Sequence, residues 1–396
     1  MTYEVAGVSA QSMPDIGARA RALQILAALA LGVIVLLGQG VLPLLLGSLE
    51  VEHRLSASGI GLAASAEALA ITLSCSLSGL FLKPLRLRMI ALVGLLALAV
   101  CNIAVVWIKG QTGIVVARAA AGFFEGVLFW IALGMIARTT MTERWGAVLN
   151  TMSIVGSVIV AAACTSYIIP RFGINGGFVA VAALSVSSTA LIPFVPERYA
   201  ALQIFDANGG VPPLRGWLAL LGTMLYTAAG MGVFIYLLPL ARFVGLGDAV
   251  ADTAVTAILL GELGGGVLAM LLAGRIGYFV ALALSALAYL GIWPIYAVRP
   301  GAWIFVVASA VTGFITFFSI PFLFPLAVEA DRSRRAALQS GPAQMLGTAV
   351  GPLLSAWTVT HYGVGGILYL SVALLVAGMG VITALRFTPG HQPLGT

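Results

Sequence analysis

Charged residues are scarce in this sequence. Asp, Glu, Lys and Arg make up only 9% of the 396 residues, whereas 61% of the residues are hydrophobic. Soluble domains of ordinary composition carry about 25% charged residues. Since no water-soluble fold can bury so large a share of apolar side chains, the composition excludes a soluble globular protein and predicts a protein of the lipid bilayer.

Cysteine and histidine are also rare, with three residues of each. They are Cys75, Cys101, Cys164, His53, His361 and His391. The cysteines share no spacing and the histidines lie far apart, so a disulfide framework and a metal motif are both excluded. The sequence also contains no nucleophile–base pair and no cofactor motif. We therefore expect no enzymatic activity, no metal and no cofactor, with a proton as the coupling ion.

Long apolar segments are what the sequence has in quantity. A helix needs roughly 20 mainly apolar residues to cross a bilayer, and such segments follow one another almost from end to end. They predict twelve membrane-spanning helices near residues 22–49, 58–82, 89–108, 113–137, 146–169, 176–195, 216–241, 251–273, 277–298, 302–328, 336–360 and 364–386. The fold class is therefore predicted to be an all-α membrane protein.

Lysine and arginine are distributed unevenly between alternate loops. One set of loops holds most of them, and the other set holds only Arg54, Lys109, Arg171, Arg242 and Arg299. Because basic loops are retained in the cytoplasm, this predicts an inner-membrane protein with both termini and the long central loop on the cytoplasmic side. The formal charge of +6 then reflects topology, so the expected partners are the bilayer and a small molecule, not nucleic acid.

The two halves of the sequence are weakly similar to each other. Residues 122–156 align without gaps with residues 313–347, which matches the fourth span with the tenth and the fifth with the eleventh. Glu67 and Glu262 occupy the same position relative to a later glycine in the second and eighth spans. Such repeats are common in transporters. We expect an N-terminal tail at 1–21, a six-helix bundle at 22–195, a central loop at 196–215, a second bundle at 216–386 and a C-terminal tail at 387–396.

Two segments resemble motifs of the major facilitator superfamily. The loop GLFLKPLRLR after the second span resembles the signature of that family, with Gly79, Arg86 and Arg88 in place but without its usual aspartate. The fourth-span segment RAAAGFFEG, from Arg118 to Gly126, resembles the R-x-x-x-G-x-x-x-G pattern of the proton-coupled drug antiporters in this superfamily.

The resemblance covers essentially the whole chain and carries several expectations. It implies two pseudo-symmetric six-helix bundles that work as a monomer by alternating access. The Gly-Pro pair associated with antiporters is missing from the fifth span but present in the eleventh. The residues that the resemblance marks as a conformational motif are Gly79, Arg86, Arg88, Gly122, Gly126, Gly351 and Pro352.

Ionisable residues inside the spans are the main functional candidates, because a charge at the bilayer centre costs at least about 2.5 to 3.5 kcal/mol. Arg118 and Glu125 lie two turns apart on one helical face, so each needs a partner on another helix or in a cavity. The aligned residues in the second half are the uncharged Ser309 and Thr316. Symmetric packing therefore does not require these charges. We expect proton coupling or substrate binding at Glu125, Arg118, Glu67 and Glu262.

A structural interpretation remains open for each of these four residues. Arg118 and Glu125 are alternatively members of buried structural ion pairs. Glu67 and Glu262 fit either a gate between the halves or a duplicated structural hydrogen bond. Burial favours the neutral, protonated form of a carboxyl group, which suits a residue that binds and releases a proton.

Polar and aromatic residues in the spans supply candidates for a cavity wall. The first and seventh helices line the central cavity in families of this type, and aromatic rings also stack on flat or lipophilic substrates. The cavity-lining candidates are Gln39, Tyr226, Tyr236, Phe129 and Trp130.

These features predict a secondary transporter that moves a small, amphiphilic organic molecule by proton-coupled alternating access, in the direction of export. A uniporter or uptake carrier for an organic anion is the first alternative, in which Arg118 holds a substrate carboxylate. A receptor that binds a ligand without moving it is the second, because a fold does not determine a function. The sequence does not rank cationic against anionic substrates.

Overall fold

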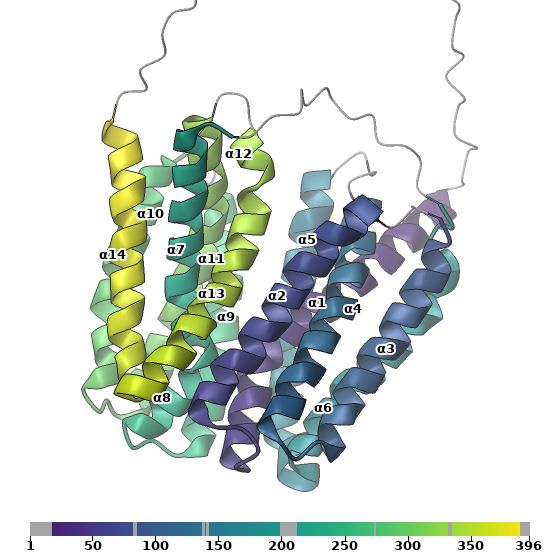
Figure 1. Cartoon of the computed structure of the whole chain (residues 1–396), viewed down its shortest axis with the longest axis horizontal. Helices are drawn as coiled ribbons and strands as arrows, with labels where there is room; N and C mark the ends of the chain where they lie inside the picture. Colours follow the sequence, from purple (N-terminus) through teal and green to yellow (C-terminus); the bar gives the residue numbers. More distant parts are fainter. Residues whose placement is uncertain are drawn as a thin grey trace, which may run out of the picture.

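Helices form nearly all of the described chain (Figure 1). The structure is a computed structural model that describes residues 18–81, 85–136, 139, 142–198, 212–272, 275–331 and 335–388. Residues 1–17, 199–211 and 389–396, which belong to the expected tails and central loop, lie outside this description. The apolar segments fold as helices because a helix satisfies its backbone hydrogen bonds internally, as a bilayer demands.

The N-terminal half ends in a short 3₁₀ helix and contains one π-helical turn. Its elements are α1 (Ala18–Val51), α2 (Ala57–Phe81), α3 (Leu87–Trp107), α4 (Gln111–Ile136), α5 (Thr142–Ala163), the π-helical η1 (Cys164–Ile168), α6 (Ile169–Ser187) and the 3₁₀ helix η2 (Ser188–Phe194).

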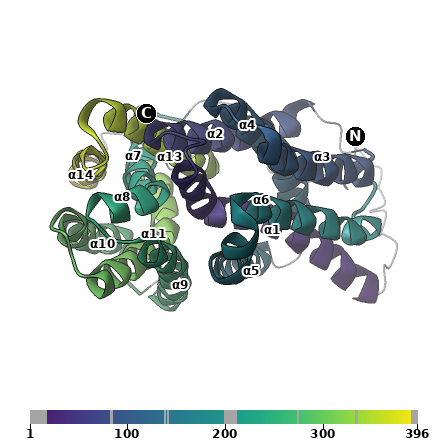
Figure 2. The same cartoon turned by 90° about the horizontal axis from the view of Figure 1, so that it is seen from below.

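The C-terminal half is built in the same way. Its elements are α7 (Leu214–Ile235), α8 (Leu237–Phe243), α9 (Asp248–Leu272), α10 (Tyr278–Ile292), the 3₁₀ helix η3 (Trp293–Ala297), α11 (Ala302–Ala330), α12 (Arg335–Leu338), α13 (Ser340–Tyr362) and α14 (Gly366–Phe387). The two halves lie side by side when the molecule is viewed along its helices (Figure 2).

The described residues form twelve crossings, which confirms the predicted fold class. Ten helical stretches are long and apolar enough to span a membrane. One of them, 148–194, contains two crossings, because the backbone reverses at Gly173 with φ of 66°. The less apolar α13 supplies the remaining crossing with its 23 residues.

Two predicted spans differ in detail from the observed helices. The seventh, expected at 216–241, breaks at Tyr236, whose φ of −98° and ψ of 18° separate α7 from α8. The fifth, expected at 146–169, runs on through η1 as far as the turn at Gly173. Hydropathy reports how deeply a segment is buried in lipid but not where its backbone turns, so it missed both features.

Glycines allow the same pair of helices to pack closely in each half. A methyl group at Gly122 of α4 would overlap the backbone of Glu67 in α2, and one at Gly126 would overlap the backbone of Ile71. In the C-terminal half, a methyl group at Gly313 of α11 would overlap the backbone of Ile258 in α9. Small residues let membrane helices approach backbone to backbone. This packing fixes the depth and direction of the charged side chains on α2 and α4.

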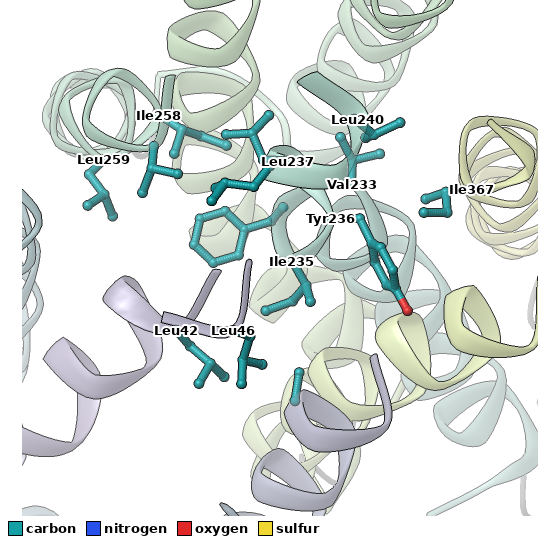
Figure 3. Close-up of a cluster of buried hydrophobic side chains, with 14 of the residues drawn as sticks. Leu42, Leu46, Val233, Ile235, Tyr236, Leu237, Leu240, Ile258, Leu259 and Ile367 are labelled. Carbon is teal, nitrogen blue, oxygen red and sulfur yellow. The ribbon is translucent and has the colours of Figure 1, made fainter. Parts of the chain in front are cut away.

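The halves contact each other at the end of the molecule away from the termini. The backbone N–H of Gly61 in α2 donates to the Tyr236 hydroxyl at 3.1 Å, and Glu50 at the end of α1 forms an ion pair with Arg242 in α8. A buried apolar cluster lies beside these contacts, and Figure 3 shows Leu42 and Leu46 of α1 facing it. Toward the end where α1 begins and α14 ends, the helices of the two halves diverge (Figure 1).

Candidate functional site

A cavity of about 210 Å³ lies between the two halves. Helices α1, α2, α4 and α5 line it from one side, and α7, α9, α10, α11 and α13 line it from the other. Most of its wall is apolar, as is usual for small-molecule sites. The polar groups in the wall include Gln39 and Asn150 from the N-terminal half, and Tyr226, Glu262, Tyr289, Thr316 and Gln344 from the C-terminal half.

Among the described residues that line the cavity, Glu262 is the only Asp, Glu, Lys or Arg. Its side chain projects from α9 and is 6% exposed. No hydrogen bond or ion pair connects it to another residue in the described part of the chain. An ionised carboxylate in this position lacks a counter-charge from the protein, so it is available to a ligand or a proton.

The other three predicted ionisable residues form a separate buried cluster within the N-terminal half. Glu67 of α2, Arg118 of α4 and Glu125 of α4 are 0%, 2% and 2% exposed. The Arg118 Nε donates to Glu67 Oε2 at 2.7 Å, and its Nη2 donates to Glu67 Oε1. A third bond runs from Arg118 Nη1 to Asn102 Oδ1 of α3 at 2.8 Å. The guanidinium is thus held by a bidentate ion pair and an amide.

Gln39 of α1 joins this ionic cluster to the cavity. Its Nε2 donates to Glu67 Oε1 at 3.1 Å and, over a longer 3.4 Å, to Glu125 Oε2. Gln39 also belongs to the cavity wall, whereas Glu67, Arg118 and Glu125 do not. A change in the position of Gln39 therefore affects the cavity and both carboxylates at once.

The charges of this cluster do not balance when both acids are ionised. Glu67 and Glu125 then contribute two negative charges and Arg118 contributes one positive charge, all within a buried network. Burying an uncompensated charge is costly. Binding of one proton makes the cluster neutral, and Glu125 is the group with fewer hydrogen bonds to its charged form.

The cavity-wall candidates from the sequence are distributed over two places. Gln39, Tyr226 and Phe129 line the cavity, whereas Tyr236 and Trp130 are not among its lining residues. Tyr236 instead lies at the contact between the halves, where its hydroxyl accepts from Gly61.

The C-terminal half contains a hydroxyl network that sequence reasoning missed. Tyr289 of α10 bonds to Thr316, which is aligned with Glu125, at 2.7 Å. Tyr296 of η3 bonds to Thr312 at 3.0 Å and to Ser309, which is aligned with Arg118, at 3.4 Å. The signal in the sequence is the presence of tyrosines in the ninth predicted span, which is followed by a span that contains Ser309, Thr312 and Thr316.

The residues of the conformational motif lie at helix contacts and at one end of α2 and α3. Gly351 packs against the backbone of Ala228 in α7, and the carbonyl oxygen of Pro352 lies against Gly61 of α2. Gly79 lies near the end of α2.

At the start of α3, Arg86 has a left-handed backbone with φ of 58°. Arg88 Nε donates to the Val195 carbonyl oxygen at 2.6 Å, which ties the start of α3 to the end of the half. The start of α3 is therefore joined to the segment after η2.

Comparisons with known proteins identify the architecture. The chain is similar to a mutant of the nucleoside transporter NupG, with a TM-score of 0.72 and 14% identity over 92% of this chain and 99% of that one. The fold is that of the major facilitator superfamily. No protein-family model and no curated protein matches the sequence.

A second similarity is to a bacterial homologue of the human lysosomal transporter Spinster. Its inward-facing, unoccupied structure has a TM-score of 0.65 and 12% identity over 93% of this chain and 95% of that one. The inward-facing, occupied structure gives 0.65 and 12% over 95% and 98%. At these identities the similarity shows the fold alone, and the chemistry depends on this chain's own residues.

Proposed function

We propose that this protein is a secondary transporter that moves a small organic molecule by proton-coupled alternating access. The observation that carries the proposal is the link through Gln39 between a cavity at the junction of the halves and a buried cluster with one excess carboxylate. Transporters of this architecture hold their substrate near the midplane between two repeats and expose it alternately to each side.

Glu125 is the proposed proton carrier of the cluster. Glu67 accepts two hydrogen bonds from Arg118 and one from Gln39, so its carboxylate is already paired with a positive charge. Among the described residues, Glu125 accepts the 3.4 Å bond from Gln39 and no bond from a cation. Protonation of Glu125 removes the excess charge, and movement of Gln39 on substrate binding changes the hydrogen bond that Gln39 donates to this carboxylate.

The proposed direction is export by exchange with protons, at the inner membrane and with both termini in the cytoplasm. The fourth-span resemblance to proton-coupled antiporters and the basic loops support this direction and topology. In that orientation the halves are joined on the outer side, through Tyr236 and the Glu50–Arg242 pair, and diverge toward the cytoplasm.

The organic-anion alternative relies on Arg118, which does not line the cavity in this arrangement. A substrate carboxylate needs a free guanidinium in the cavity, but Arg118 lies outside the cavity wall and is fully engaged by Glu67 and Asn102. The cavity wall offers no other basic side chain among the described residues.

Flux measurements in proteoliposomes test the proposal. A panel of labelled small organic cations, anions and nucleosides is offered to vesicles with an imposed pH gradient. At least one compound is expected to accumulate when the lumen is the more acidic side, because protons leave as substrate enters.

The matched variants are Glu125→Gln and the exposed Glu329→Gln, whose native carboxylate pairs with Arg386 at the end of α11. Glu125→Gln is expected to abolish gradient-driven accumulation, and Glu329→Gln to preserve it. Accumulation driven only by an alkaline lumen would contradict antiport, and a Glu125→Gln variant that still responds to the gradient would contradict the assigned carrier.

A further inference from the structure

The acidic and basic residues of the cavity wall are of one kind. Glu262 is its only acid and no basic residue lines it, within the part of the chain that the structure describes. The single buried guanidinium nearby, that of Arg118, is neutralised by Glu67 and separated from the cavity by Gln39. An anion entering this space would meet a carboxylate without meeting a cation.

Glu262 is positioned to bind a ligand and not to hold the helices together. It is 6% exposed, and no hydrogen bond or ion pair engages it in the described residues. A structural carboxylate in a membrane helix is normally paired with a donor on a neighbouring helix. For Glu262, the cavity lies where such a donor would be.

Aromatic residues share the cavity wall with this carboxylate, and Tyr289 is near enough to interact with it electrostatically. The rings of Tyr226 and Tyr289 lie 6.4 Å apart at their centroids with an angle of 56° between their planes. Tyr289 is fixed further by stacking on Trp293 at 4.7 Å and by its bond to Thr316. Tyrosine rings attract organic cations through their π faces, most strongly where water is excluded.

The Tyr226 hydroxyl supplies a second unused polar group. Tyr226 is 3% exposed, and its oxygen makes no hydrogen bond within ordinary geometric limits, although the hydroxyls of Ser285 and Ser319 lie near it. Buried hydroxyl groups are seldom left in this state, because each unmade bond costs free energy. An N–H or O–H group of a ligand would satisfy it.

Apolar side chains in the opposite wall suit the uncharged part of a ligand. Val35, Leu36 and Phe129 face the cavity from α1 and α4, with Ile154 from α5. The volume of about 210 Å³ is below the usual range for drug-sized ligands, so the occupant is small.

We propose that the cavity selects a small organic cation, with its positively charged nitrogen paired to Glu262 and flanked by Tyr226 and Tyr289. This inference rests on the proposed transport function and adds its substrate class. It also separates two tasks, since Glu262 holds the substrate while the cluster in the other half holds the proton.

Equilibrium binding to the purified full-length protein in lipid nanodiscs tests the substrate class without requiring transport. The probes are benzyltrimethylammonium, whose charge does not depend on pH, the anion phenylmethanesulfonate of similar shape, and the neutral nucleoside uridine. Calorimetry is expected to show binding of the cation with an affinity at least about tenfold above that of either other probe.

The decisive variant is Glu262→Gln, which keeps the shape of the side chain and removes its charge. It is expected to weaken binding of benzyltrimethylammonium by at least about 30-fold, since it removes one partner of a desolvated charge pair. Glu262→Asp keeps the charge and is expected to retain part of the affinity. Glu329→Gln is the control and is expected to bind as the parent does. The melting temperature of each variant separates lost binding from lost folding.

Several results would overturn the inference. They are cation binding weaker than about 1 mM in the parent, equal or tighter binding of the anion or of uridine, and unchanged cation affinity in folded Glu262→Gln. Cation binding through Glu262 without any flux in vesicles would contradict the transport proposal and keep the cation site. Flux of anions or nucleosides that does not depend on Glu262 would do the reverse.

Discussion

The two halves share their packing and differ in their chemistry. In both, glycines bring the second and fourth helices of the half into backbone contact, α2 with α4 and α9 with α11. The N-terminal half then buries an ionic network around Arg118, whereas the aligned Ser309 and Thr316 of the C-terminal half join tyrosine hydroxyls. A duplicated framework thus tolerates different polar groups at matched positions.

The acids of the two halves differ in the same sense. Glu67 is bonded to Arg118 behind the cavity wall, whereas Glu262 faces the cavity without a partner. The repeat places both acids at similar depth, but only their neighbours decide what each does. The carboxylate of Glu67 is bonded by the protein, whereas that of Glu262 faces the cavity, where we propose that it meets a ligand.

The largest expected effect comes from removing the positive charge of the N-terminal network. Arg118→Met leaves Glu67 buried without its counter-charge and is expected to lower the free energy of unfolding by about 3–5 kcal/mol. Chemical denaturation in detergent measures it. The double variant Glu67→Gln with Arg118→Met is expected to recover much of the loss, and Ser309→Ala in the other half to cost only about 1 kcal/mol. A single variant as stable as the double one would show that the ion pair is not the source.

The shared packing predicts effects of equal sign in both halves. Gly122→Ala and Gly313→Ala each introduce a methyl group against the backbone of the adjoining helix and are expected to destabilise by about 1–3 kcal/mol. Gly380→Ala in α14 meets no atom within 4 Å and is the matched control, expected to be neutral or stabilising. Thermal unfolding compares the three. If only one of the first two were sensitive, the packing would not be equivalent.

The hydroxyl network of the C-terminal half predicts a smaller loss. Tyr289→Phe removes the bond to Thr316 and is expected to cost about 1 kcal/mol of unfolding free energy. Tyr226→Phe removes a hydroxyl that makes no bond and is expected to leave stability unchanged or higher. Denaturation of the two variants in parallel measures the difference. Equal losses would indicate that the Thr316 bond contributes nothing.

The smallest effect is expected where the halves meet. Both side chains of the Glu50–Arg242 pair are about one-quarter exposed. Glu50→Gln is therefore expected to weaken the contact between the halves by less than about 1 kcal/mol. The readout is the rate at which Leu46→Cys, in a background with the native cysteines replaced by alanine, reacts with a membrane-impermeant thiol reagent. A modest rise is expected, and no rise with the control Glu329→Gln. A rate unchanged by Glu50→Gln would show that this pair does not stabilise the contact between the halves.

Sequence alone predicted the helices and the two-bundle fold, because each crossing needs an apolar segment of sufficient length. It also pointed to Arg118 and Glu125 as residues in need of partners. It did not identify those partners, since hydropathy gives the depth of a side chain but not the direction it faces. The Glu67–Arg118 pair joins residues 51 positions apart on different helices, and only the packing of α2 on α4 brings them together.

Other parts of the site were beyond sequence reasoning for the same reason. The sequence predicts Gln39 as a wall residue, but its position between the cavity and two carboxylates depends on the meeting of α1, α2 and α4. Tyr236 was expected in the wall, yet the break after α7 turns it to the contact between the halves. Local turns and helix directions set these positions, and neither leaves a clear mark in composition.

The central claim is that the N-terminal half carries the proton and the C-terminal half carries the substrate. The most direct test measures uptake of labelled benzyltrimethylammonium into proteoliposomes, with and without an acidic lumen, for the parent, Glu125→Gln and Glu262→Gln. Glu125→Gln is expected to keep exchange without a gradient and to lose accumulation with one, whereas Glu262→Gln is expected to lose both. A Glu262→Gln variant that exchanges the cation normally but no longer responds to the pH gradient would contradict the account.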